Sequence, residues 1–195
     1  DELDSLVKEE VIPNYKGLDI YAAAAIYSNE AFGTAQVWYF NIENLIDSDV
    51  VVSADITALK DAGIKLHADY ATANLDDSVS KDTQTYFNVN ASYSANGLSA
   101  QLGYAATDED GGVVALDADA PIAVLGVTQQ KYGINGTADT SAVYANASFK
   151  ADKATVYAGV LAINDDTAAN NDDTDTIVGV KYAYSKKLGV HVYYD

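Results

Sequence analysis

Hydrophobic and polar residues alternate along most of this chain, most clearly between Phe87 and Tyr104. In the sequence FNVNASYSANGLSAQLGY, apolar side chains recur at every second position on both sides of an Asn-Gly dipeptide. Alternation of this period around Asn-Gly is typical of a β-hairpin. The same pattern predicts ten strands, at residues 18–28, 32–41, 50–59, 63–73, 85–95, 98–106, 140–150, 154–163, 176–185 and 188–195.

The connections between these strands are alternately short and long. The long ones carry about −15 of the formal net charge of −18, whereas the short turns together are slightly basic. A sheet with short turns at one end, long loops at the other and strands of about 9–11 residues is typical of a membrane barrel. We therefore predict an all-β fold, an antiparallel transmembrane β-barrel. Residues 1–17 are predicted to form an acidic leader and residues 18–195 a barrel segment. The predicted long external loops are 41–49, 74–84, 107–139 and 164–175.

The two faces of the predicted strands differ in chemistry. One face carries aliphatic residues between two aromatic bands, as expected for a wall in contact with lipid. The predicted interface aromatics are Tyr39, Tyr70, Phe87, Tyr104 and Tyr194 near the long loops, and Tyr93, Phe149 and Tyr184 near the short turns. Charged residues on the other face would be costly in a dry core but acceptable in a wet lumen. The predicted pore-lining residues are Asp19, Gln36, Asp55, Lys65, His67, Asp69, Asn88, Asn90, Gln101, Lys181 and His191.

Composition narrows the classes of function. The strong acidic charge argues against nucleic acid as a partner, because phosphate contacts require a basic surface. The chain has no Cys, His67 and His191 lie on different predicted strands, and no catalytic spacing is present. We therefore predict neither an enzyme nor a cofactor, but a channel for passive diffusion of small hydrophilic solutes, with a preference for cations.

A second interpretation of the same pattern stays open. The strands could form a β-sandwich in a soluble or surface-attached adhesin, whose acidic loops bind calcium or a host ligand. Solubility without detergent and an absence of conductance would distinguish the adhesin from the channel.

The loop at 107–139 contains an apolar run, GGVVALDADAPIAVLGV. If this loop folds inward, Asp117 and Asp119 narrow and charge the pore; the alternative is a solvated surface loop. Clustered carboxylates in the loops are also candidate calcium ligands. The stretch beginning at Asp108 does not have EF-hand spacing, because Val113 occupies the position that requires Gly.

Strand direction indicates an interior segment of a larger barrel. The first predicted strand starts at the long-loop end and the last one finishes there. Bacterial single-chain barrels normally have both termini at the short-turn end. We therefore expect further strands before Asp1 and after Asp195.

Four stretches resemble the major outer-membrane porins of Campylobacter and related bacteria: GLDIYAAAAIYS, AQVWYF, VVVSADITALKDAGIKLHADYATANLDDS and SANGLSAQLGYAATDED. The resemblance extends from about residue 17 to residue 150 in strand order and spacing, and the chain departs from the family most in 107–139 and 164–175. It implies a homotrimeric porin in outer-membrane lipid, with a roughly 18-stranded barrel and a water-filled channel for small hydrophilic and cationic solutes.

Overall fold

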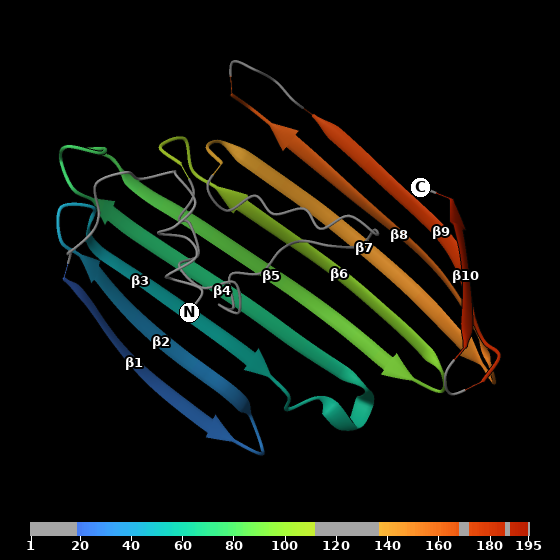
Figure 1. Ribbon diagram of the computed structural model, residues 1–195. Coiled ribbons are helices and arrows are strands. Elements are labelled where there is room, and N and C mark those ends of the chain that lie inside the picture. The colour runs from blue at the N-terminus through green and yellow to red at the C-terminus, as the bar shows by residue number, and fades with distance from the viewer. Residues whose placement is uncertain (1–18, 112–136, 168–171, 186–187, 195) are drawn as a thin grey trace.

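A single antiparallel sheet makes up the fold. The computed structural model describes residues 19–111, 137–167, 172–185 and 188–194, and their ten strands are hydrogen-bonded in sequence order (Figure 1). A short 3-10 helix, η1 (Lys60–Ala62), separates β3 from β4. The strands are β1 (Ile20–Asn29), β2 (Gly33–Ile42), β3 (Ile46–Ile56), β4 (Ile64–Leu75), β5 (Thr83–Ala95), β6 (Leu98–Thr107), β7 (Thr140–Ala151), β8 (Ala154–Asp165), β9 (Asp173–Ala183) and β10 (Gly189–Tyr194).

The hairpin predicted around Asn96–Gly97 is confirmed. Strands β5 and β6 pair from Tyr86–Thr107 to Ala95–Leu98, which leaves a two-residue turn. Asn96 has φ 52° and Gly97 has φ 82°. Positive φ at both central residues is the requirement of a type I′ turn, whose twist matches that of the flanking strands. The local sequence thus fixes the register of this pair.

The connection between β2 and β3 is much shorter than the predicted loop at 41–49. It comprises residues 43–45, closed by a 3.0 Å hydrogen bond from Leu45 N to Ile42 O. The Asn41 side chain donates to the carbonyls of Ile46 and Asp47, at 3.1 and 2.8 Å, across a register shift. Asp and Asn are depleted in strands, so the acidic sequence resembles a loop although its backbone pairs with β2 and β4.

Register places every second residue of the ten strands on a common face, except at the start of β3, where the pairing shifts by one residue. We call the face of Gln36, Asp55, His67, Gln101 and Lys181 the polar face. The opposite, aliphatic face carries large exposed side chains, including Val52, Leu102, Val143, Val156, Val178 and Val192. A contiguous exposed aliphatic face of this size marks a surface that contacts lipid or another protein.

The polar face also contains a cluster of hydrophobic residues, which the sequence analysis did not predict. Its cluster of buried hydrophobic residues consists of Val51, Ala71, Ala73, Tyr86, Ala105, Ala142, Tyr144 and Leu161. Trp38 and Phe40 pack against this cluster with parallel rings whose centroids lie 6.2 Å apart. Large and small residues on neighbouring strands pack against each other in this cluster. Full burial of a side chain such as Leu161 contributes about 1.5–3 kcal/mol to the stability of the fold.

Candidate functional site

Three ionisable side chains meet on the polar face of β3 and β4. His67 lies between two carboxylates: Nδ1 is 2.9 Å from Asp55 Oδ1, and Nε2 is 2.7 Å from Asp69 Oδ2. Asp55 is exposed over 58% of its side chain, whereas the Asp69 side chain is fully buried. Alternation along β4 brings His67 and Asp69 to the same face, and the pairing of β3 with β4 sets Asp55 directly opposite His67.

Hydrogen bonds extend this cluster across the sheet. Asn88 on β5 donates to Asp69 Oδ2 at 3.2 Å. The hydroxyl of Tyr144 on β7 donates to Asn88 Oδ1 at 2.9 Å. Side chains from β3, β4, β5 and β7 are therefore joined in one network that runs across the strands.

A second row of hydrogen-bonded amides lies beside this network. Asn146 on β7 donates to Gln101 Oε1 at 3.0 Å, and Gln101 on β6 donates to Asn90 Oδ1 at 3.3 Å. All three residues are partly exposed. Amide side chains both donate and accept, so this row presents hydrogen-bonding groups of both kinds to whatever fills the space in front of the sheet.

Basic and aromatic side chains gather on β8, β9 and β10. Lys181 Nζ lies 5.1 Å from the centroid of the Tyr157 ring, which is within the range of a cation–π interaction. The Tyr157 hydroxyl is hydrogen-bonded to His191 Nε2. The His191 ring also lies 5.0 Å from the ring of Tyr193.

The predicted pore-lining residues lie together, with one exception. The structure places Gln36, Asp55, Lys65, His67, Asp69, Asn88, Asn90, Gln101, Lys181 and His191 on the polar face. Asp19 directly precedes β1. It is two residues before Tyr21 and therefore lies on the same side of the sheet as Tyr21, the aliphatic face. We therefore leave Asp19 out of the candidate wall. The candidate constriction residues Asp117 and Asp119 lie outside the described residues.

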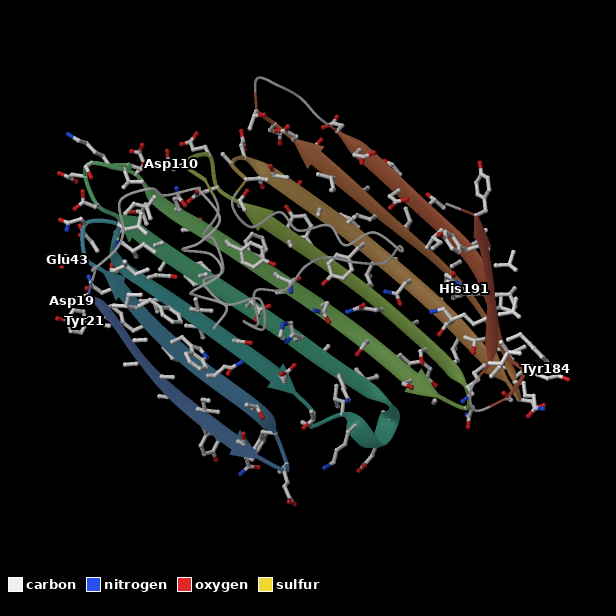
Figure 2. All side chains as sticks on the ribbon, viewed as in Figure 1. Asp19, Tyr21, Glu43, Asp110, Tyr184 and His191 are labelled. Atoms are coloured by element: carbon white, nitrogen blue, oxygen red, sulfur yellow. The ribbon has the colours of Figure 1, made fainter. Side chains whose placement is uncertain are left out.

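The predicted interface aromatics follow the opposite alternation. Tyr39, Tyr70, Phe87, Tyr93, Tyr104, Phe149 and Tyr194 belong to the aliphatic face. Figure 2 shows Asp19, Glu43 and Asp110 at the end of the sheet where the long connections lie, and Tyr184 at the other end. Their assignment to membrane interfaces stays a prediction.

Sequence reasoning missed the aromatic residues of the polar face. Trp38, Tyr86, Tyr144 and Tyr157 all lie there. The signal was available in the alternation, because Tyr86 is two residues before Asn88 and Tyr144 is two residues before Asn146. The partners of these rings depend on the register between strands, which alternation does not give.

The connection at 76–82, after β4, is ordered by its own side chains. Ser78 N donates to Asp76 Oδ1 at 2.8 Å. The pKa of the exposed Asp76 carboxyl is lowered below its ordinary value, mainly by a hydrogen bond from the Ser78 side chain and to a smaller extent by one from the Ser78 backbone. Within the described ranges, no cluster of three or more His, Asp or Glu residues is arranged to hold a metal ion. The described part also contains no helix long and apolar enough to cross a membrane.

Comparison with known proteins gives the chain a family. Residues 19–195 match the family described as Gram-negative porin. No curated protein sequence matches the chain.

Solved structures give the fold. The crystal structure of Pseudomonas aeruginosa OccK3 (OpdO) is similar, with a TM-score of 0.68 and 15% identity over 88% of this chain and 50% of that chain. Acinetobacter baumannii OccAB4 has a TM-score of 0.64 and 13% identity over 89% of this chain and 47% of its own. P. aeruginosa OccK11 (OpdR) has a TM-score of 0.61 and 13% identity over 88% of this chain and 50% of that chain. The chain spans about half the length of these structures.

The predicted fold class and location are thereby confirmed. The antiparallel sheet matches outer-membrane β-barrels in strand arrangement, and the family match places the chain in the bacterial outer membrane. Because the match covers nearly the whole chain, the chain belongs to the Gram-negative porin family, whose members are channels and not enzymes.

Proposed function

We propose that this chain forms part of the wall of a water-filled channel for passive diffusion of small hydrophilic solutes. The observation that carries the proposal is the contrast between the two faces of one sheet. The polar face holds hydrogen-bonded rows from Asp55 to Tyr144 and from Asn90 to Asn146. The other face exposes aliphatic side chains. In a membrane barrel these two chemistries belong to lumen and lipid, respectively.

A preference for cations follows from the charges on the polar face. Among the described residues of that face, carboxylates outnumber lysines. The carboxylates are Asp49, Asp55, Asp69, Asp165, Asp173 and Asp175, and the lysines are Lys65, Lys150 and Lys181. A pore wall of low dielectric focuses the field of such charges, which enriches cations at the entrance.

The finer assignments rest on the resemblance to the Campylobacter porins quoted above. They are a homotrimer, a roughly 18-stranded closed barrel and outer-membrane lipid as the surrounding partner. Calcium binding by loop carboxylates such as Asp117 and Asp119 is proposed from their sequence alone; no other cofactor is proposed.

Reconstitution tests the proposed function. The protein in planar bilayers should give stepwise conductance, and its reversal potential across a KCl gradient should show cations moving more easily than anions. The preference should weaken as salt rises, because charges more than about 8–10 Å apart are screened at physiological ionic strength. A protein that is soluble without detergent and gives no conductance would instead support the β-sandwich adhesin.

A further inference from the structure

Two tyrosines of the polar face lie directly over glycines of the neighbouring strand. Tyr144 on β7 is paired with Gly103 on β6, and Tyr157 on β8 is paired with Gly179 on β9. A Cβ atom added to Gly103 would stand 2.5 Å from Tyr144 Cε1 and closer still to its Cζ and hydroxyl. A Cβ atom added to Gly179 would stand 2.5 Å from Tyr157 Cζ and 2.8 Å from Cε1. Each ring therefore occupies the space that a side chain at the glycine position would need.

Each tyrosine also reaches across the glycine strand to a third strand. The Tyr144 hydroxyl passes β6 and donates to Asn88 on β5. The Tyr157 hydroxyl passes β9 and is hydrogen-bonded to His191 on β10. The same arrangement of tyrosine, glycine and polar partner on three successive strands thus occurs twice, in different parts of the sheet.

We propose that Gly103 and Gly179 set the width of the channel, because they allow Tyr144 and Tyr157 to lie flat against its wall. The proposal rests on the channel function proposed above, which makes the polar face the lumen. A ring cannot move backwards through the sheet. A methyl group on the glycine would therefore push the ring forwards, into the lumen, and break its hydrogen bond to the third strand.

The atoms that would meet the added methyl group belong to the far end of a side chain rather than to the backbone. Rotation of the Tyr144 side chain can relieve the overlap, so the barrel of a Gly103→Ala variant is expected to assemble. Gly189 provides a matched control on the same face. A Cβ atom there would lie 3.4 Å from Tyr182 O, which is an ordinary contact.

Single-channel conductance in planar bilayers tests the proposal. Gly103→Ala should conduct less than the wild type, whereas Gly189→Ala should not differ from it. The double variant Gly103→Ala/Tyr144→Ala should recover at least the wild-type conductance, because it has no ring to displace. Gly179→Ala and its combination with Tyr157→Ala repeat the test at the second site.

Nitration of Tyr144 by tetranitromethane, followed by mass spectrometry, gives a readout that does not depend on conductance. Tyr144 is 4% exposed and should be protected in the wild type, but should react in Gly103→Ala. A wild-type protein without conductance would contradict the proposed function, while nitration would still report where the ring lies.

Two outcomes would overturn the inference. One is wild-type conductance together with continued protection of Tyr144 in Gly103→Ala. The other applies if Gly103→Ala does not assemble: the double variant should then assemble, and its failure to do so would show that Gly103 is needed for a reason other than the ring.

Discussion

His67 shows how much one residue can contribute to the polar face. Its ring satisfies a carboxylate oxygen of Asp69, whose other oxygen, Oδ1, finds no partner among the described residues. Removal of the ring in His67→Ala leaves the buried Asp69 with Asn88 as its remaining side-chain donor. A buried polar group that loses its partner costs about 1–3 kcal/mol. We expect a loss of that size in the free energy of unfolding, measured by denaturant titration in lipid vesicles with fluorescence of the single tryptophan, Trp38.

The control is Asp55→Ala, which removes the other partner of the same ring. Asp55 is 58% exposed, so water replaces its interaction and the loss should stay below about 1 kcal/mol. Equal losses in the two variants would contradict the view that burial of Asp69 determines the effect.

At the scale of elements, β8 shows the difference between the two faces of a strand. Val160 lies at the middle of β8 on the aliphatic face. A lysine at the midplane of a lipid-facing barrel wall costs about 2–4 kcal/mol. Val160→Lys should therefore lower the free energy of unfolding by this amount in vesicles.

Asn146 on the adjacent strand is the matched control. It pairs with Gly159 at the same depth but belongs to the polar face. Asn146→Lys should lower the free energy of unfolding by only about 1 kcal/mol, because it removes the hydrogen bond to Gln101. Its main effect should be a weaker preference of the channel for cations. Equal destabilisation by the two lysines would mean that the two faces have been assigned wrongly.

The turn between β5 and β6 supports a separate prediction. A Cβ atom on Gly97 would lie 2.6 Å from the carbonyl oxygen of Lys150, and its φ of 82° disfavours other residues. Gly97→Val should cost about 1–3 kcal/mol and slow the assembly of this hairpin, measured by the heat-dependent shift of folded barrels in gel electrophoresis. Asn96→Gly keeps positive φ accessible and should assemble like the wild type; slow assembly of that variant would contradict the argument.

Alternation and turn chemistry were enough to predict the ten strands and, apart from Asp19, the face of each predicted pore-lining residue that the structure describes, because these properties follow from period 2 and from dipeptides such as Asn96–Gly97. They were not enough where pairing overrides local composition. Asp49 belongs to an acidic stretch with the composition of a loop, yet its pairing with Phe40 on β2 and Ala73 on β4 holds it in β3. The Tyr144–Gly103 pair was also beyond prediction, because the long connection between β6 and β7 leaves their register undetermined by sequence.

At the scale of the whole molecule, the charges of the polar face are unevenly distributed along the strands. The lysines lie near the short turns: Lys65 follows the first residue of β4, and Lys181 is two residues from the end of β9. Most carboxylates lie towards the opposite end, where Asp165 ends β8 and Asp173 begins β9; the exception is Asp55, which lies near the short-turn end of β3. Strands β1 to β9 run between these two ends of the sheet (Figure 1), whereas β10 covers six residues and pairs only with the second half of β9.

Such a wall should make the current asymmetric. The acidic end accumulates cations and the basic end accumulates anions, so a voltage that is positive on the long-connection side drives both kinds of ion towards the middle of the pore. Current should be larger at this polarity than at the reverse one, and the difference should shrink in high salt as screening shortens the range of the charges. Neutralising the basic end with Lys65→Gln, Lys150→Gln and Lys181→Gln should remove most of the asymmetry and strengthen cation preference in the same recordings. An asymmetry of opposite sign, or one that the lysine variants leave unchanged, would show that charges outside the described polar face control the current.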